Sequence, residues 1–382
     1  MDKIKVLQFG PLDLRKGGPT LSTYLTVKGL MQNNMDVEVL TYHIEDRKYL
    51  IGQDVKAIFM DKSWNERFKY VPTLPKQLKS LSQYDIYHIQ GLQEYPCIEM
   101  AKKAKSEGAP YLLTLRGLLY PQAMSVKPFV KKMAMRLYAN KLLRNAACIQ
   151  ATCKEEMEFY REYGFKNPVA IIPNPIETDG IIERPIKSPE KFRIGYIGRI
   201  HPRKRIERLI YAFDAIKERG QNCELLIIGA DVPEYEQFLK DEVARLHLEN
   251  VRFTGFLKGK EKDEALCSLS YLMVPSDFEN FGNIVSEALV RGVPVVTSRG
   301  MPWQILEEYH CGWGIDNNQA SINKMVEELL RIPEPERIQM GENGKKLIMN
   351  EFSIPALGKK MSDLYRWVLK QGEKPSFVYT SE

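Results

Sequence analysis

The sequence predicts an α/β fold with two doubly wound, parallel-sheet (Rossmann-like) domains. Short apolar runs alternate with longer amphipathic segments along most of the chain, and this alternation is typical of parallel strands joined by helices. A chain of 382 residues is long for a single hydrophobic core, which favours two domains. The alternation stops at a proline-rich run and then starts again, so this run marks the predicted domain boundary.

The strands expected in the first domain, residues 1–175, cover residues 4–9, 37–42, 57–60, 86–89, 111–115, 148–151 and 169–172. A linker at 173–191 follows, kept irregular by Pro173, Pro185 and Pro189. The strands expected in the second domain, residues 190–353, cover 192–197, 224–228, 251–253, 271–274 and 293–297. A helix at 205–219 is expected to end at Gly220. Beyond residue 319 the pattern is helical throughout, and the last amphipathic segment, about 354–370, is expected to pack back across both domains.

Composition excludes several classes of protein. No apolar run reaches the roughly 18 residues that a membrane span needs, and the N-terminus lacks the layout of a signal peptide, so a cytoplasmic location is expected. Six scattered cysteines without a CxxC pair, and only five histidines, favour buried reduced thiols over a disulfide framework or a metal site. The net charge of +6, without an aromatic-basic motif, does not indicate nucleic-acid binding.

The positive charge belongs to the N-terminal half, where residues 1–172 hold 26 Lys and Arg against 17 Asp and Glu. Residues 118–146 contain no acid, and their cations are interleaved with apolar side chains: Lys127, Lys131, Lys132, Arg136, Lys141 and Arg144. Such a stretch can lie on an anionic membrane surface. It can equally be a core helix with a cationic solvent face, and the sequence leaves both readings open.

The stretch PSDFENFGNIVSEALVRGVP, residues 275–294, follows a predicted buried strand and leads into a helix. Such strand–loop–helix junctions are where α/β proteins hold ligands. Glu279 lies in the loop and Glu287 on the helix, with Gly282 near the helix start, where free amides can face a polar or anionic ligand. The alternative is a capped surface helix with two solvated glutamates.

Two further loops follow predicted strands. Residues 10–19 form a glycine-rich loop in which Gly17 and Gly18 allow close approach of backbone to a ligand, although the spacing is not that of a dinucleotide site. Residues 198–204 place Arg199 and Lys204 just before a helix, a suitable position for holding a diphosphate. Ordinary surface loops are the alternative in both cases. Polar residues also end two strands of the first domain, namely His88, Gln90 and Arg116.

These residues carry a resemblance to the retaining glycosyltransferases of family four, which have the GT-B architecture of two doubly wound domains facing a central cleft. The resemblance covers most of the chain, including the Gly-Gly-Pro loop, IIPNPI, GRIHPRK, VRFTGFL, ENFGNIVSEAL and GVPVVTS. Its most specific element is the Glu-x7-Glu spacing of Glu279 and Glu287, together with Arg199 and Lys204. The segment MPWQILEEYHCGWGI further resembles members that build bacterial surface polysaccharides such as capsule, exopolysaccharide and O-antigen.

The resemblance implies a role for each matching residue. Arg199 and Lys204 would hold the donor diphosphate and stabilise the leaving group, without a metal or other cofactor. Glu279 would contact the transferred sugar and Glu287 the donor ribose. The remaining donor-binding residues would be Gly18 at the diphosphate, Phe256 in the 253–257 segment beside the nucleobase, and Phe281, Gly282 and Asn283 around the sugar.

Arg116 departs from the family pattern, because many relatives place a histidine there. A guanidinium stays protonated near neutrality and cannot act as a base, so Arg116 is expected to act electrostatically on the donor or on an acceptor phosphate. His88 matches only part of a histidine-rich family segment. Its role is therefore either in the acceptor site or structural.

The resemblance implies transfer with retention, in which the diphosphate leaves on the face that the acceptor hydroxyl attacks and itself takes the proton. The expected donor is a nucleotide-sugar, with UDP as the expected nucleotide. The expected acceptor is a glycan, carried on polyprenyl diphosphate at the inner membrane face, with Lys131, Lys132 and Arg136 toward the anionic membrane or acceptor. Two alternatives are a sugar-nucleotide epimerase of the same fold and a catalytically silent binding subunit. The sugar, linkage and oligomeric state are not predicted.

Overall fold

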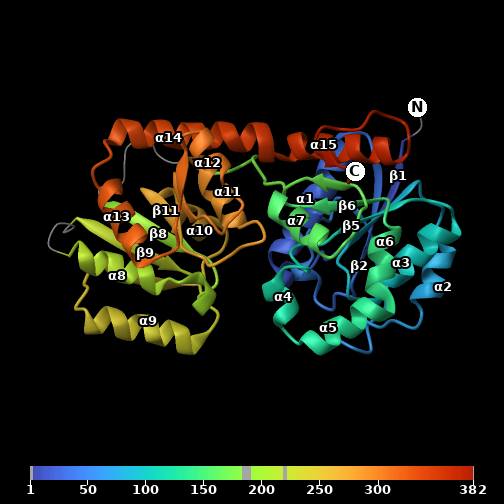
Figure 1. Ribbon diagram of the computed structural model, residues 1–382, viewed down its shortest axis with the longest axis horizontal. Helices are drawn as coiled ribbons and strands as arrows, with labels where there is room; N and C mark the ends of the chain where they lie inside the picture. The colour runs from blue at the N-terminus through green and yellow to red at the C-terminus, as the bar shows by residue number, and fades with distance from the viewer. Residues whose placement is uncertain (1–2, 183–190, 218–221, 382) are drawn as a thin grey trace. The chain divides into compact units, whose positions relative to one another are not determined.

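The computed structural model describes residues 3–182, 191–217 and 222–381, which form two compact units (Figure 1). Unit 1 comprises Met1–Pro175 together with Ser353–Glu382, and unit 2 comprises Ile176–Phe352. Each unit contains one predominantly parallel sheet with helices on both faces. The predicted class, two doubly wound α/β domains, is therefore confirmed.

The sheet of unit 1 has the strand order β14-β7-β6-β5-β4-β1-β2-β3. Its strands are β1 (Lys5–Phe9), β2 (Asp36–Thr41), β3 (Lys56–Phe59), β4 (Ile86–Gln90), β5 (Tyr111–Thr114), β6 (Cys148–Ala151), β7 (Val169–Ile171) and β14 (Val378–Tyr379). All neighbouring pairs are parallel except β14 with β7. The parallel strands thus end at one edge, where the loops after β1, β4 and β5 lie.

Helices cover both faces of this sheet. The longer helices are α1 (Gly18–Gln32), α2 (Leu74–Ser80), α3 (Tyr95–Ser106), α7 (Lys154–Glu162) and α15 (Ile354–Val368). Residues 121–145 form α4 (Pro121–Ser125), α5 (Pro128–Ala134), the π-helical turn η3 (Met135–Ala139) and α6 (Asn140–Asn145). The short 3-10 turns are η1 (Leu14–Lys16) and η2 (Arg47–Tyr49). One apolar core joins the sheet to α1 and α15, and a second joins it to α2, α3 and α6.

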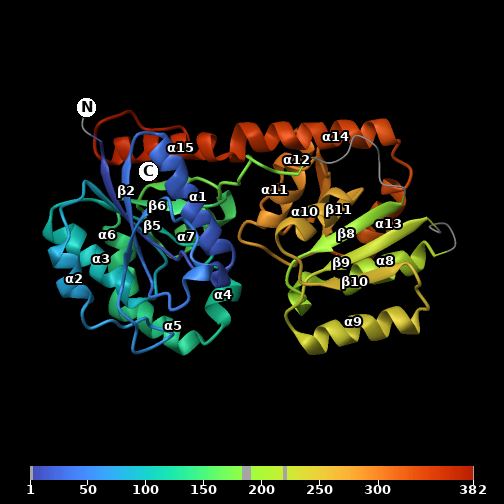
Figure 2. The same cartoon turned by 180° about the vertical axis from the view of Figure 1, so that it is seen from behind.

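The sheet of unit 2 has the order β10-β9-β8-β11-β12-β13, and all its pairs are parallel. Its strands are β8 (Phe192–Ile197), β9 (Cys223–Ile228), β10 (Val251–Gly255), β11 (Tyr271–Val274), β12 (Val295–Ser298) and β13 (Gly312–Ile315). Its helices are η4 (Pro202–Lys204), α8 (Glu207–Ala215), α9 (Pro233–Arg245), α10 (Gly259–Cys267), α11 (Asn283–Leu289), α12 (Ile305–Glu308), α13 (Gln319–Leu329), α14 (Glu334–Leu347) and η5 (Ile348–Phe352). Helices α8, α9 and α13 share one apolar core with the sheet (Figure 2), and α10, α11 and α12 share the other.

Two strands were missed by the sequence prediction. Strand β13 reads GWGI, and its two glycines give it little strand propensity. Strand β14 has only two residues and is held by pairing with β7, so the prediction that the chain is wholly helical beyond residue 319 was wrong. The predicted stop at Gly220 and the linker prolines Pro185 and Pro189 lie outside the described residues.

All six cysteines are free and buried, as predicted. Among the described residues, no helix has the length and apolar character of a membrane span. The same described residues contain no group of three or more His, Cys, Asp or Glu side chains that could hold a metal ion.

The C-terminal helix α15 is fixed to unit 1 by close packing and by a buried polar contact. It lies beside α1 (Figure 1), and the two helices approach so closely at Gly29 and Gly358 that a Cβ on Gly358 would lie 2.5 Å from the Gly29 carbonyl oxygen. Further along α15, the Tyr365 hydroxyl lies 2.6 Å from His88 Nδ1 on β4. Both residues are fully buried, so this bond joins α15 to the centre of the sheet.

We predict that Tyr365→Phe lowers the free energy of unfolding by about 1–3 kcal/mol, because His88 then loses a partner inside the core. Urea denaturation measures the change. Tyr379→Phe is the matched control, since Tyr379 is 46% exposed and its substitution is expected to change stability by less than about 0.5 kcal/mol. Equal stability of Tyr365→Phe and wild type would contradict this role of α15.

Candidate active site

The candidate site in unit 2 lies where two adjacent strands end. Strands β8 and β11 pair in parallel, so the loops that follow them, 198–206 and 275–282, lie at the same edge of the sheet. The Asp277 amide donates to the Arg203 carbonyl at 3.0 Å, and Arg205 Nε donates to Asp277 Oδ2 at 2.8 Å. These contacts hold the two loops against each other, which brings together two of the catalytic residues predicted from sequence.

Lys204 and Glu279 form an ion pair at this junction. Lys204 ends the single 3-10 turn η4 and is only 8% exposed, while Ser276 Oγ donates to Glu279 Oε1 at 3.1 Å. Burial, followed by the positive charges of Arg203 and Arg199, lowers the pKa of Lys204 to about 8. The Glu279 carboxylate acts in the opposite direction on the same ammonium group. The site therefore holds a partly desolvated cation that favours an anionic partner.

Arg199 stands apart from this pair. Its guanidinium binds Asp231 Oδ2 through both Nε, at 2.8 Å, and Nη2, at 2.7 Å, and its side chain is 62% exposed. It lies two residues after the end of β8, at the same sheet edge as Lys204, without belonging to the Lys204–Glu279 pair. In this structure Asp231 neutralises the charge that was predicted to face the diphosphate.

The loop that carries Glu279 rests on an aromatic cluster. Phe281 is 4% exposed, and its ring centroid lies 5.0 Å from that of Trp303 and 5.9 Å from that of Phe352. Trp303 Nε1 donates to the Phe281 carbonyl at 2.6 Å. The Phe281 side chain is thus a core residue, and its carbonyl already has a partner. Trp303 was not predicted as a site residue, although it lies in the MPWQILEEYH segment.

The other predicted donor-binding residues of unit 2 lie along the same sheet edge. Gly282 caps α11 with φ +79°, a backbone conformation that favours glycine, and a Cβ there would also push against the Met301 methyl group at 2.7 Å. Asn283 begins α11. Glu287 on α11 is ion-paired with Lys262 of α10. Phe256 directly follows β10 and is 73% exposed, which leaves its ring free to stack on a planar group.

Arg116 is the central polar residue of unit 1. It follows β5 with φ +50°, and its guanidinium donates to Gln90 Oε1 at 2.6 Å, Ser22 Oγ at 2.6 Å and Asn174 Oδ1 at 2.9 Å. All three acceptors are neutral. Burial lowers the pKa of Arg116 to about 10, so the side chain remains a cation at neutral pH. Arg116 is held rigidly, and no described carboxylate forms an ion pair with it.

His88 belongs to the core. It is fully buried, its Nδ1 lies 2.6 Å from the Tyr365 hydroxyl and its Nε2 lies 2.6 Å from Thr114 Oγ1. Burial, followed by the charge of Arg116, lowers the pKa of His88 to about 3. Of the two roles that the sequence left open, the structure therefore supports the structural one, and the proposed acceptor contact of His88 is corrected.

The predicted acceptor-side cations lie on α5 and η3. The Lys131 ammonium donates to the Ala123 carbonyl, so it caps the preceding helix. Lys132 and Arg136 are exposed and form no ion pair with any described residue. The opposite side of this segment contributes Met135, Ala139, Leu142 and Leu143 to the core.

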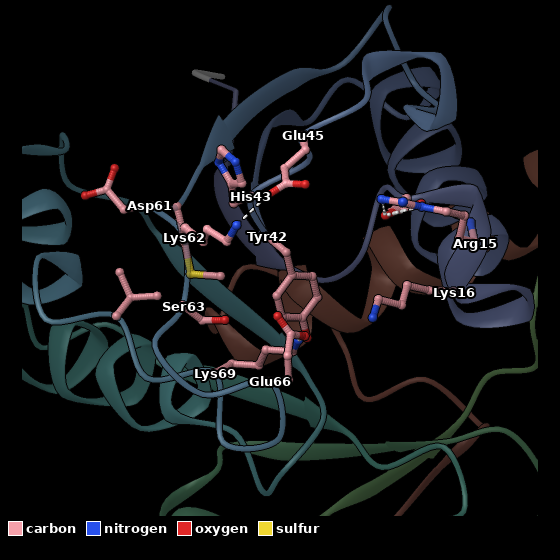
Figure 3. Close-up of a pocket in the computed structure, with 13 residues that line it drawn as sticks. Arg15, Lys16, Tyr42, His43, Glu45, Asp61, Lys62, Ser63, Glu66 and Lys69 are labelled. Carbon is pink, nitrogen blue, oxygen red and sulfur yellow. Dashed lines mark hydrogen bonds and ion pairs between the residues drawn. The ribbon is translucent and has the colours of Figure 1, made fainter.

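The glycine-rich loop of unit 1 leads into α1, which begins at Gly18 after Gly17 with φ +70°. The part of the loop just before it contributes Asp13, Arg15 and Lys16 to a cavity of about 330 Å³, whose other lining residues follow β2 and β3. Figure 3 shows the lining side chains, with Lys62 directed toward Glu45. The cavity thus lies at the edge where the strands of unit 1 end.

The cavity contains as many acids as cations. Its ionisable lining comprises Asp13, Glu45, Asp61 and Glu66 with Arg15, Lys16, Lys62 and Lys69, besides His43. Arg15 pairs with Asp13 at 2.6 Å, Lys62 pairs with Glu45 at 2.5 Å and Lys69 pairs with Glu66. Tyr42, Met60 and Val71 supply apolar surface. A cavity of this kind suits a polar, neutral ligand rich in hydroxyl groups.

Two family models match consecutive parts of the chain. The model described as Glycosyltransferase Family 4 matches residues 16–179, and the model described as Glycosyl transferases group 1 matches residues 179–347. The second match contains Arg199, Lys204, Glu279 and Glu287. Each half of the chain thus matches a family of glycosyltransferases.

Individual relatives agree with this assignment. The capsular polysaccharide biosynthesis glycosyltransferase CapM of Staphylococcus aureus is 24% identical over 69% of this chain and 71% of its own length. Among solved structures, Anabaena HepE in complex with UDP has a TM-score of 0.76 at 16% identity, covering 94% of this chain and 99% of that chain. TarM has a TM-score of 0.75 at 13% identity, covering 95% and 98%. The structural likenesses show the shared GT-B fold.

We predict that Trp303→Phe lowers the free energy of unfolding by about 1–3 kcal/mol, because the buried Phe281 carbonyl loses its donor. Urea denaturation followed by circular dichroism measures the change. Trp64→Phe makes the same substitution at a side chain that is 79% exposed, and it is expected to leave stability unchanged. If both variants unfold alike, Trp303 does not support the Glu279 loop.

Proposed function

We propose that the protein is a retaining, metal-independent glycosyltransferase that moves a sugar from a UDP-sugar to a lipid-linked glycan in surface polysaccharide synthesis. The observation that carries the proposal is the Lys204–Glu279 pair, a desolvated cation and an acid at the edge where β8 and β11 end. A diphosphate supplies the anion that such a lysine favours, and a sugar supplies hydroxyl donors to the carboxylate.

In this proposal Lys204 binds the donor diphosphate and stabilises the negative charge that grows on it as the glycosidic bond breaks. Arg199 joins it by exchanging Asp231 for the phosphate, since its guanidinium is exposed and follows the same strand. Glu279 turns from Lys204 to the hydroxyls of the transferred sugar. The resting ion pair thereby keeps both groups oriented until the donor replaces it.

The rest of the donor would lie along α11 and β10. Glu287 accepts from the ribose hydroxyls, for which it must give up its contact with Lys262. Gly282 and Asn283 border the sugar, and the exposed ring of Phe256 stacks on the base. The assignment of Gly18 to the diphosphate stays a prediction. Phe281 positions this loop from within the core.

Retention follows if the acceptor hydroxyl attacks the face that the diphosphate leaves. The departing phosphate oxygen then takes the hydroxyl proton, and no protein carboxylate has to act as nucleophile. Two cations provide the charge stabilisation for this step. The same route would need no metal ion, because Lys204 and Arg199 neutralise the leaving group.

The acceptor would bind in unit 1. The cavity in Figure 3 suits its sugar residues, because the paired acids and cations can exchange hydrogen bonds with hydroxyl groups while Tyr42 covers an apolar ring face. Arg116, a rigid cation with neutral partners, is suited to an acceptor phosphate. A glycan carried on polyprenyl diphosphate has both the sugar residues and the phosphate that these sites would bind. The exposed Lys132 and Arg136 then face an anionic membrane, as expected for a cytoplasmic enzyme at the inner face of the cell membrane.

The names of relatives support this choice of substrates. CapM is named for capsular polysaccharide biosynthesis, and another relative, 25% identical over 45% of this chain, is a poly(ribitol-phosphate) α-N-acetylglucosaminyltransferase. HepE has been solved in complex with UDP and with UDP-glucose. Surface polysaccharides and UDP therefore recur among the proteins that this chain resembles.

We predict that Lys204→Ala and Glu279→Ala each reduce sugar transfer by at least about 100-fold, while circular dichroism shows folded protein. The assay follows transfer from radiolabelled UDP-sugars to membrane lipid extracts. Lys240→Ala and Glu236→Ala are the matched controls, because these residues form a comparable ion pair, 2.7 Å long, on α9. The controls are expected to keep wild-type activity.

Near-normal transfer by either Lys204→Ala or Glu279→Ala would overturn the proposed site. Incubation of the wild-type enzyme with donor alone distinguishes a transferase from a sugar-nucleotide epimerase, since an epimerase converts the sugar nucleotide without an acceptor.

A further inference from the structure

A second groove of unit 1, of about 710 Å³, lies between α3 and the segment formed by η3 and α6. Its walls are largely apolar and include Ile98, Ala109, Leu137 and Leu142. Both walls belong to the face of the sheet that α2, α3 and α6 cover. The groove is separate from the cavity of Figure 3, with which it shares no lining residue.

The charges of this groove are of one sign. Its ionisable lining consists of Lys102, Lys105 and Lys141, with Tyr111 and Tyr138, and includes no carboxylate. Lys102 pairs with Glu99 at 2.7 Å, whereas neither Lys105 nor Lys141 forms an ion pair within the described part of the chain. An apolar trough with two uncompensated cations is complementary to an amphiphile with an anionic head.

An exposed apolar stripe leads to the groove. It consists of five apolar side chains within residues 126–137, each at least 45% exposed: Val126, Phe129, Val130, Met133 and Leu137. The π-helical turn η3 lies in this stripe, with the Asn140 amide donating to the Met135 carbonyl. Leu137, 71% exposed, belongs both to the stripe and to the groove. The two features therefore form one continuous apolar surface.

We propose that this groove seats one acyl chain of an anionic phospholipid, whose phosphate binds Lys105 and Lys141 while the stripe enters the membrane interface. The proposal rests on the proposed function at a membrane surface and deepens it by naming a lipid site. A soluble sugar phosphate would leave the apolar walls unfilled, and an apolar peptide would leave both lysines unpaired. An anionic phospholipid satisfies both requirements, and the stripe places the groove beside the bilayer.

Titration with dihexanoyl-phosphatidylglycerol below its micelle concentration tests the site. We expect saturable binding of one lipid per chain, with weaker binding of dihexanoyl-phosphatidylcholine and none of inorganic phosphate. Lys105→Glu with Lys141→Glu should weaken binding by on the order of thirtyfold or more, as the loss of two lysines implies. Lys76→Glu with Lys79→Glu changes the net charge equally on α2 and should have no effect.

The apolar half of the site is tested by Ala109→Phe, which fills the groove, and by Leu137→Ser at an exposed position. Both should weaken lipid binding and reduce flotation with phosphatidylglycerol vesicles, while turnover of donor on a soluble acceptor stays at the wild-type rate. If the wild-type protein binds the lipid but transfers no sugar from any donor, the result counts against the proposed function and leaves the lipid site standing. Lipid binding that is unchanged in the double lysine variant and in Leu137→Ser, or tighter one-to-one binding of farnesyl diphosphate than of phosphatidylglycerol, would overturn the proposal.

Discussion

The buried contact between Lys204 and Glu279 is the interaction on which the rest of the site depends. Removing an ammonium group from water costs several kcal/mol, and a nearby anion has to offset that cost. Glu279 does so here, and the bonds between Arg203, Arg205 and Asp277 fix the two loops that bring the pair together. Trp303 stabilises the Glu279 loop by donating a hydrogen bond to the Phe281 carbonyl. The pair is therefore supported by hydrogen bonds between the loops and by packed core side chains, without any contribution from a ligand.

The buried cation of unit 1, Arg116, has a different environment. Arg116 donates to the neutral acceptors Gln90, Ser22 and Asn174, which fix its orientation. The buried Glu156 carboxylate acts on its charge electrostatically without a direct ion pair, and the guanidinium keeps the capacity to bind a further anion. Lys204 has an internal anion that a ligand must displace, which favours exchange of one anion for another. The two cations thus suit the two substrates of a transferase, a donor that is bound and released in each cycle and an acceptor that carries its own charge.

The sequence predicted the strands well because apolar runs bounded by glycine and proline leave few alternatives. It also predicted Lys204 and Glu279 as partners in one site, through a family motif. It could not predict that Arg199 pairs with Asp231, because that contact depends on the neighbouring loop after β9. Phe281 and His88 were placed in or near a ligand site because their neighbours are polar or glycine. Their burial depends on Trp303 and Tyr365, which are distant in sequence, so no local pattern could show it. The groove between α3 and α6 could likewise not be predicted from the sequence, because it is formed only when α3 packs beside η3.

In the proposed mechanism, the Lys204 ammonium group binds the donor diphosphate. Isothermal titration of UDP across pH 6 to 10 tests it most directly, using wild type and Lys204→Arg. The pKa of Lys204 is lowered to about 8, so the ammonium cation is present below that pH and is lost above it. A bound anion opposes this loss of charge, because it raises the pKa of the lysine. We predict that the affinity of the wild type for UDP falls as the pH rises through and above 8, and that Lys204→Arg keeps its affinity over the same range. An affinity that is flat with pH in the wild type, or that falls identically in both proteins, would contradict it.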